Sequence, residues 1–241
     1  MKGKFYGVSV GPGDPEYMTL KAVRVIGGCS VIAVPRTGGE KTKALEIARE
    51  AVDMSGKELL YLDFLMSRDK KKITECYDML AALVAQKLEA GLDVAMLNLG
   101  DASLYASHSY IQQRLAALGY ETETVSGVTS FCACAARLGT SLTAARQPLR
   151  ILPGDYAGLE DELKMPGTKV IMKSGRELPR VIQALKNSGS YSLAKLVTNC
   201  GMEDETVWQS LEEAEAGYFS TILVGEGDQD KGDQDKGDWH K

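Results

Sequence analysis

Gly11-Pro12-Gly13-Asp14-Pro15 is the stretch of this 241-residue chain that decides its fold class. It follows an apolar run at 5–10 and precedes a helical pattern that begins near Thr19. A glycine-containing turn between a buried strand and a helix is typical of α/β proteins, whose ligands bind beyond the carboxyl ends of the strands. The stretch therefore predicts a binding loop close to the start of the chain.

This loop differs from the fingerprint of dinucleotide-binding proteins. The third glycine of that fingerprint is replaced by Glu16, and the next apolar run, 30–34, ends in Pro35-Arg36 instead of an acidic residue that would hold a ribose. Pro12 and Pro15 also lack the backbone N–H groups that a phosphate cradle needs. The loop is therefore built for shape and not for binding anions.

Composition excludes several classes of protein. Hydrophobic residues make up 44% of the chain, which supports a real core, and the formal net charge is −5. Nucleic-acid binding normally needs a basic patch, so no nucleic-acid partner is expected. The five cysteines are odd in number and lack a C-x-x-C pair, so we expect neither disulfides nor a metal site. No apolar block long enough to span a membrane is present, and the chain is expected to be cytoplasmic and free of membranes.

The first half of the chain alternates strand and helix signals. Strands are predicted near 4–10, 30–34, 57–62, 94–99 and 120–125, and helices near 19–26, 42–53, 74–90 and 103–118. This alternation predicts a mostly parallel sheet with helices on both faces.

The second half of the chain has a different texture. A small-residue helix is predicted at 130–138, strands near 149–152, 168–172, 193–198, 206–210 and 218–224, and one helix near 177–187. Closely spaced strands near the end of the chain indicate antiparallel pairing and a mixed sheet. We expect an N-terminal α/β domain at 1–124, a C-terminal α/β domain at 125–226, and a disordered tail at 227–241, where Gly-Asp-Gln-Asp-Lys occurs twice.

Two further loops join the first one as candidates for the binding site. Gly100-Asp101-Ala102-Ser103-Leu104-Tyr105 follows the fourth predicted strand, and Ser126-Gly127-Val128-Thr129-Ser130 follows the fifth and opens the next helix. Since parallel strands end at the same edge of a sheet, the three turns should converge on one cleft.

At these three loops the chain resembles the tetrapyrrole (precorrin) methylases, over residues 4 to about 225. That family has a Gly-x-Gly-Pro-Gly-Asp-Pro loop, a Gly-Asp-Pro-x-x-Tyr-like loop and a Pro-Gly-x-Thr-Ser helix start, in this order. Ala102 and Ser126 stand where the family usually has proline. The resemblance implies the two-domain α/β fold of class III methyltransferases, with a mostly parallel N-terminal sheet and a mixed C-terminal sheet.

Within the family the chain looks most like the branch that methylates carbon 20 of precorrin-2 or cobalt-precorrin-2. The stretches that carry this likeness are 148–154, 170–173 with 178–181, and 218–224. The resemblance implies a methyltransferase of cobalamin and porphyrin biosynthesis that uses S-adenosyl-L-methionine, releases S-adenosyl-L-homocysteine, and forms a homodimer.

The resemblance also assigns candidate site residues. Those implied to bind the cofactor are Pro12, Leu99, Gly100, Asp101, Leu104, Thr129, Ser130, Met172 and Cys200. Gly11, Gly13 and Asp14 would shape the tetrapyrrole trough. Arg36, Lys173 and Arg176 lie at predicted strand ends and would pair with the acetate and propionate arms of the substrate.

Methyl transfer needs little from the protein besides positioning, which can supply on the order of 7–11 kcal/mol. Removal of the proton from carbon 20 needs a base, for which Asp101, Tyr105 and His108 are candidates, the first two taken as catalytic.

Other interpretations remain open at this stage. The chain could methylate a different ring carbon or a protein residue, or be a catalytically silent tetrapyrrole carrier. Locally, Asp101 could cap a turn, Thr129 and Ser130 could cap a helix, and His108 could be a partly exposed structural residue. Cys132 and Cys134 are expected to be small buried fillers. Lys70-Lys71-Lys72 is expected to be a solvated helix start, with binding of substrate carboxylates the minor alternative.

Overall fold

A computed structural model describes residues 1–37, 42–144, 146–215 and 217–225. The tail predicted at 227–241 lies outside these residues. The chain divides into two compact units, Met1–Ala133 with Cys200–Glu203, and Cys134–Asn199 with Asp204–Lys241. The domain bounds expected from the sequence, 1–124 and 125–226, stay a prediction.

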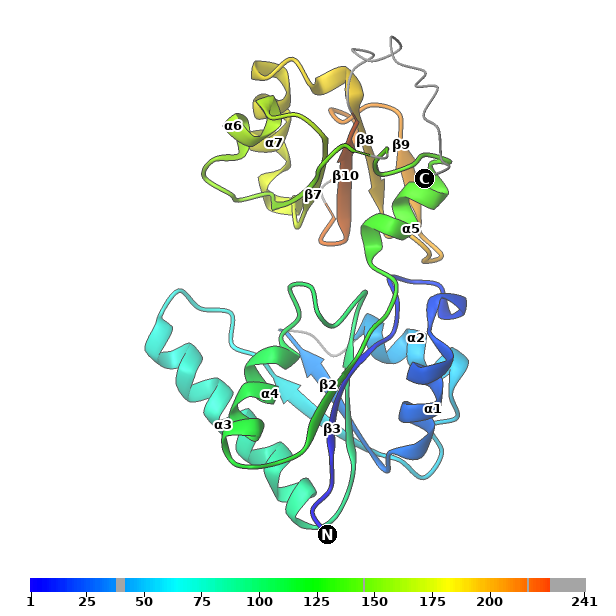
Figure 1. Ribbon diagram of the computed structural model, residues 1–241, viewed down its shortest axis with the longest axis vertical. Helices are drawn as coiled ribbons and strands as arrows, with labels where there is room; N and C mark the ends of the chain where they lie inside the picture. The colour runs from blue at the N-terminus through cyan, green and yellow to red at the C-terminus, as the bar shows by residue number, and fades with distance from the viewer. Residues whose placement is uncertain (38–41, 145, 216, 226–241) are drawn as a thin grey trace, which may run out of the picture. The chain divides into compact units, whose positions relative to one another are not determined.

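The first unit contains a five-stranded parallel sheet (Figure 1). Its strands are β1 (Phe5–Ser9), β2 (Val31–Arg36), β3 (Glu58–Asp63), β4 (Val94–Asn98) and β5 (Thr122–Val125), in the order β3-β2-β4-β1-β5. All four neighbouring pairs are parallel, which confirms the predicted sheet. The strands β4, β1 and β5 are adjacent, so the loops that follow them leave the same edge side by side.

Helices cover both faces of this sheet. The helices α1 (Leu20–Gly28) and α2 (Lys43–Ala51) share one apolar core with the strands, and α3 (Lys70–Glu89) and α4 (His108–Ala117) share a second. Ile26 and Ala48 belong to the first core, Leu88 and Leu115 to the second, and all four are fully buried. The short 3-10 helix η1 (Pro15–Tyr17) closes the first loop.

The second unit contains a mixed sheet, as expected. Its strands are β6 (Leu149–Pro153), β7 (Thr168–Met172), β8 (Ala194–Thr198), β9 (Thr206–Trp208) and β10 (Ser220–Val224), in the order β6-β7-β10-β8-β9. Only β6 and β7 are parallel, and the other three pairs are antiparallel. The helices α6 (Leu159–Lys164) and α7 (Leu178–Asn187) pack on this sheet through a core that includes Leu163, Val181 and Leu185. Two 3-10 helices, η2 (Gly175–Glu177) and η3 (Tyr191–Leu193), flank α7.

The helix α5 (Ser130–Arg137) contains the point at which the chain passes from one unit to the other. It confirms the small-residue helix that was predicted near 130–138. Cys134 on it is buried, as expected, but Cys132 is exposed, so the expectation of a buried filler was wrong for that residue.

Several predicted bounds differ from those in the structure. The helix predicted at 74–90 begins at Lys70, because the Asp69 side chain accepts hydrogen bonds from the backbone N–H groups of Lys71 and Lys72. The helix predicted at 103–118 begins only at His108, since the preceding residues form a loop around Asp101. The six-residue helix α6 was not predicted, because so short a segment carries little periodicity.

Candidate active site

Backbone hydrogen bonds join the first two candidate loops directly. Gly11 N–H donates to Gly100 O over 3.2 Å, and Gly100 N–H donates to Gly11 O over 2.7 Å. Gly11 has φ of 75° and Gly100 has φ of 69°, a left-handed conformation that glycine adopts without steric cost. The pairing therefore depends on glycine at both positions and extends the β1–β4 contact beyond the ends of the strands.

Asp101 joins the second loop to the third. Its Oδ2 accepts a hydrogen bond from Gly127 N–H over 2.7 Å. Its Oδ1 accepts from Ser103 N–H over 2.7 Å and also from the Ser103 hydroxyl. Both carboxylate oxygens are thus engaged within the loops, and the residue is 9% exposed.

The environment of Asp101 favours its charged form. Burial acts to raise the pKa of the carboxyl, but the hydrogen bonds from Ser103 and Gly127 outweigh burial and hold the pKa below its usual value. A carboxylate with a lowered pKa and no remaining orientation freedom is a poor proton acceptor. Asp101 thus holds the second and third loops together, and the role of base that was predicted for it stays a prediction.

Ser9, at the end of β1, connects the second loop to the end of β5, and the sequence did not identify it as a site residue. Its buried hydroxyl donates to Val125 O over 2.6 Å and accepts from Ala102 N–H over 2.8 Å. A β-carbon on Gly127 would lie only 2.4 Å from the β-carbon of Ser9, so the third loop passes directly over this residue. The available signal was a polar residue at the end of an otherwise apolar strand.

Gly13 is held by a close backbone approach. A β-carbon at Gly13 would lie 2.5 Å from Cys200 O, and one at Gly201 would lie 2.7 Å from Asp14 N. The Asp14 side chain accepts a hydrogen bond from Glu16 N–H over 2.8 Å. The first loop is therefore packed against residues that lie almost two hundred positions later in the chain, and Cys200 belongs with it.

The third loop offers an unused polar group. The hydroxyl of Thr129 is buried and has no hydrogen-bond partner among the residues that the structure describes. Ser130 begins α5 and is half-buried. A buried hydroxyl at the edge of the sheet fits contact with a polar ligand, because such a group is costly to leave unpaired.

The other candidates of the first unit differ in exposure. Pro12 is buried, whereas Leu99 and Leu104 are half-buried. Tyr105 is 45% exposed and has φ of 52°, a left-handed conformation that is uncommon for a residue with a side chain. Such backbone strain is frequent at functional sites.

Arg36 ends β2 and forms an ion pair with Asp63 at the end of β3. The guanidinium donates through Nε and Nη2 to both carboxylate oxygens, over 2.8 and 2.7 Å. The cation that was predicted to bind a substrate carboxylate is therefore paired with a carboxylate of the chain itself.

His108 is 2% exposed, which overturns the expectation of a partly exposed residue. Its Nε2 lies 3.3 Å from the Thr124 hydroxyl, which itself donates to the Gln112 side chain over 2.9 Å. Its Nδ1 is buried without a partner in the described part of the chain. Burial lowers the pKa of the imidazole, although the Gln112 hydrogen bond and the charge of Asp101 oppose this shift.

The remaining candidates belong to the second unit. Met172 ends β7 and is half-buried, and Lys173 and Arg176 follow it and are exposed. Lys173, which directly follows β7, has φ of 56° and is thus also left-handed. The Ser174 hydroxyl is buried and has no partner among the described residues.

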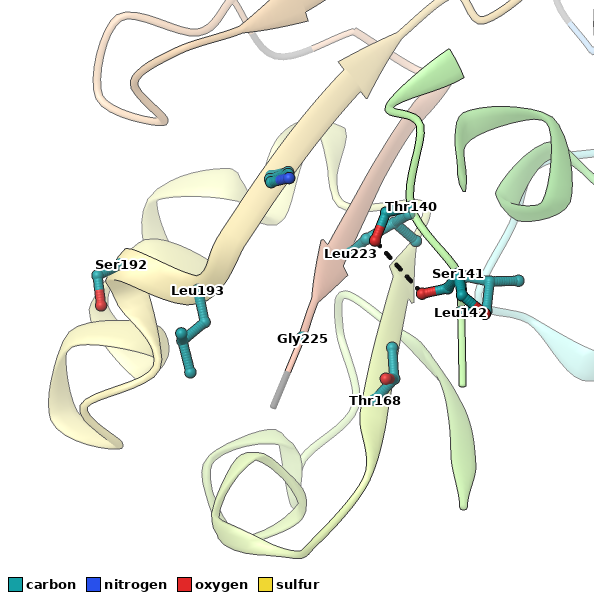
Figure 2. Close-up of a pocket in the computed structure, with 9 residues that line it drawn as sticks. Thr140, Ser141, Leu142, Thr168, Ser192, Leu193, Leu223 and Gly225 are labelled. Atoms are coloured by element: carbon teal, nitrogen blue, oxygen red, sulfur yellow. Dashed lines mark hydrogen bonds between the residues drawn. The ribbon is translucent and has the colours of Figure 1, made fainter. Parts of the chain in front are cut away.

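A pocket of about 250 Å³ lies elsewhere in the second unit (Figure 2). Its lining includes Thr168, which begins β7, Leu223 of β10, and Thr140. Thr168 and Met172 stand at opposite ends of β7, so within the second unit the pocket and Met172 lie at different ends of this strand.

Two features are absent from the described ranges, 1–37, 42–144, 146–215 and 217–225. These ranges contain no group of three or more acidic, histidine or cysteine side chains suited to a metal ion. No helix within them combines the length and apolar character needed to cross a bilayer.

Comparison with known proteins identifies close relatives over nearly the whole chain. Residues 4–215 match the family described as Tetrapyrrole (Corrin/Porphyrin) Methylases. The chain is 34% identical to a protein of a Sinorhizobium species named precorrin-2 C(20)-methyltransferase, over 92% of this chain and 95% of the relative. It is 32% identical to the cobalt-precorrin-2 C(20)-methyltransferase of Salmonella typhimurium, over 94% of this chain and 98% of the relative.

A solved structure shares the fold. The uroporphyrin-III C-methyl transferase of Thermus thermophilus, complexed with S-adenyl homocysteine, superposes with a TM-score of 0.69 at 22% identity, over 92% of each chain. The family match covers most of the chain, and the two sequence relatives are similar from end to end. The chain therefore belongs to the tetrapyrrole methylases.

Proposed function

We propose that this protein is an S-adenosylmethionine-dependent methyltransferase that methylates carbon 20 of precorrin-2 or cobalt-precorrin-2 in cobalamin biosynthesis. The names and the end-to-end similarity of the two relatives support this reaction. The observation that carries it in the structure is the junction of three loops at one edge of the parallel sheet, by the Gly11–Gly100 pairing and by the Asp101–Gly127 hydrogen bond.

The residues at this junction fit a cofactor with polar and apolar parts. The Thr129 hydroxyl is buried and lacks a partner among the described residues, so a ligand atom can satisfy it. Leu99 and Leu104 are half-buried apolar side chains in the same loops. We assign cofactor binding to these three residues with Pro12, Gly100, Asp101, Ser130, Met172 and Cys200.

S-adenosylmethionine, when bound, supplies an electrophilic methyl group on its sulfonium sulfur. The chain contributes orientation. Asp101 anchors Gly127 and so fixes the backbone that leads to Thr129. Tyr105 is the exposed, left-handed residue of the second loop and is the better candidate to touch the substrate.

We assign substrate binding to a rigid loop that shapes the site and to cationic side chains that attract the substrate's carboxylates. Gly11, Gly13 and Asp14 form a loop whose backbone is held on both sides, by Gly100 and by Gly201. Arg36, Lys173 and Arg176 supply cations for the carboxylate arms of the tetrapyrrole. As for many enzymes of such pathways, we expect a cytoplasmic homodimer, with a role in porphyrin biosynthesis through the shared precursor.

The decisive experiment is an anaerobic incubation with methyl-labelled S-adenosylmethionine and precorrin-2, with and without cobalt in the ring, followed by location of the labelled carbon. Label at carbon 20 is the expected result. Label at another ring carbon would make this protein a different methylase of the family. Cofactor and substrate binding without transfer would support the carrier alternative.

A further inference from the structure

The ends of β2 and β3 form a small charged cluster at the edge of the first sheet. Arg36 and Asp63 are register partners on these parallel strands. Their side chains form a bidentate ion pair. The Cζ atom of Arg36 lies 4.5 Å from the centre of the Tyr61 ring. The aromatic ring and the carboxylate together hold the plane of the guanidinium.

The pair lies at the edge of the sheet from which the candidate loops leave. β2 is parallel to β4, and β4 is followed by the Gly100 loop. Side chains alternate along a strand, so Arg36 shares a face with Val34, and Asp63 shares one with Tyr61. On this face of the sheet, Val34 belongs to the apolar core, and the last residues of the two strands form the ion pair.

Exposed apolar side chains lie close to the pair in the sequence. Leu65 and Met66 lie two and three residues beyond Asp63, the last residue of β3, with exposed fractions of 43% and 77%. Tyr61 is 38% exposed. Large apolar side chains next to a cation suit a ligand that is itself part apolar plate and part carboxylate, as a tetrapyrrole is.

We propose that Asp63 is a specificity-determining residue for the tetrapyrrole. It neutralises Arg36, so that a carboxylate alone gains little at this surface. A ligand that also covers Tyr61, Leu65 and Met66 gains enough to draw the guanidinium away from Asp63. This inference rests on the proposed function, since it assigns the substrate's carboxylate arms to the surface of that site.

The energetics permit such an exchange. The Arg36 side chain is 27% exposed and that of Asp63 is 69% exposed. A substrate carboxylate that takes the place of Asp63 keeps the guanidinium paired, so replacing one carboxylate by another costs little. The negative charge of Asp63, by contrast, opposes every incoming anion, and salt screens this repulsion.

The test measures binding of precorrin-2 under anaerobic conditions, by the change in its absorbance, at low and at high ionic strength. Asp63→Asn is expected to lower the dissociation constant about two- to five-fold at low salt, with a smaller gain at high salt. Arg36→Gln is expected to weaken binding, and Asp63→Asn should give a smaller gain in the Arg36→Gln background than in the wild type, because only the direct charge repulsion is then removed.

A matched control separates this effect from net charge. Asp53→Asn removes the same charge from a loop at the amino end of β3, where Asp53 bonds Ser55 N–H. It should leave precorrin-2 binding unchanged. An equal gain from Asp53→Asn and Asp63→Asn would overturn the proposal, as would an unchanged or weaker affinity of Asp63→Asn.

The outcomes for Asp63 and for the proposed function are distinguishable. Methyl transfer to carbon 20 by the wild type, with no gain in affinity from Asp63→Asn, would refute only the role of Asp63. Binding that responds as expected, without methyl transfer by the wild type, would refute the proposed reaction and retain the tetrapyrrole surface. Failure of the wild type to bind precorrin-2 would overturn both.

Discussion

The imidazole of His108 occupies the space that a side chain at Gly7 would need. A β-carbon on Gly7 would lie 2.1 Å from Cδ2 of His108. The first residue of α4, His108, therefore packs against β1 where Gly7 has no side chain. The buried position of the imidazole requires glycine at position 7.

Gly7→Ala is expected to destabilise the protein by about 1–3 kcal/mol, because the new methyl group overlaps the imidazole. In a His108→Ala background the same substitution should cost much less, since the space is then vacant. Urea unfolding of the four proteins measures this coupling. Equal costs in the two backgrounds would show that the contact does not limit this position.

His108 should also make stability depend on pH. Burial lowers its folded pKa below the ordinary value of 6.5, so the contribution of the neutral imidazole is present above that pH and is lost as pH falls toward the folded pKa. Between about pH 7.5 and about pH 5.5 the free energy of unfolding should fall more for the wild type than for His108→Gln. Parallel pH profiles for the two proteins would contradict this account.

Ser9→Ala should cost about 1–3 kcal/mol of stability. The substitution leaves Ala102 N–H and Val125 O without their buried partner. Ser188→Ala is a suitable control, because that hydroxyl donates to Leu185 O at a half-buried helix end and its loss should cost less. Chemical denaturation compares the two, and a smaller loss for Ser9→Ala than for Ser188→Ala would be inconsistent with the bridging role.

Gly13→Ala should destabilise the first loop by about 1–3 kcal/mol, because the added carbon would lie 2.5 Å from Cys200 O, which is backbone. The control is Gly27→Ala in α1, where nothing lies within 4 Å of the new carbon. There alanine should stabilise the helix by up to about 1 kcal/mol. Thermal unfolding should therefore shift in opposite directions for the two variants.

Asp101→Asn should weaken binding of S-adenosylhomocysteine about ten-fold or more. The introduced asparagine has one oxygen that can accept a hydrogen bond, whereas the carboxylate of Asp101 accepts through both oxygens, from Ser103 N–H and from Gly127 N–H. One hydrogen bond to a charged group is therefore lost, worth about 1.5–3 kcal/mol. Titration calorimetry measures the affinity. Asp69→Asn, which retains a capping side chain at the start of α3, should bind as the wild type does. Unchanged affinity of Asp101→Asn would remove this residue from the cofactor site.

Much of the fold could be predicted because the signals are local. The apolar run ending near Val10 and the capping Thr19, whose hydroxyl accepts from Ala22 N–H, lie within a few residues of the structures they specify. The start of α4 was misplaced because the loop before it is held by Asp101, whose partner Gly127 lies 26 positions away. Helical periodicity carries no information about such a bond.

The candidate site shows the same division. Motif order along the chain pointed to the loops at Gly11, Gly100 and Gly127, and the structure joins them at adjacent strands. The roles of single residues were less accessible. Arg36 was assigned to substrate from its place at a strand end, whereas its pairing with Asp63 depends on the register of β2 against β3.

The sequence by itself determined the alternation of strands and helices, the three glycine-containing loops and the family, because each depends on residues close together in the chain. Only the tertiary structure decided three contacts. The carboxylate of Asp101 accepts hydrogen bonds from two loops, the backbone at Gly13 lies close to that of Cys200, and Asp63 forms an ion pair with Arg36. Those contacts depend on strand order and register, which bring distant residues to one edge of a sheet.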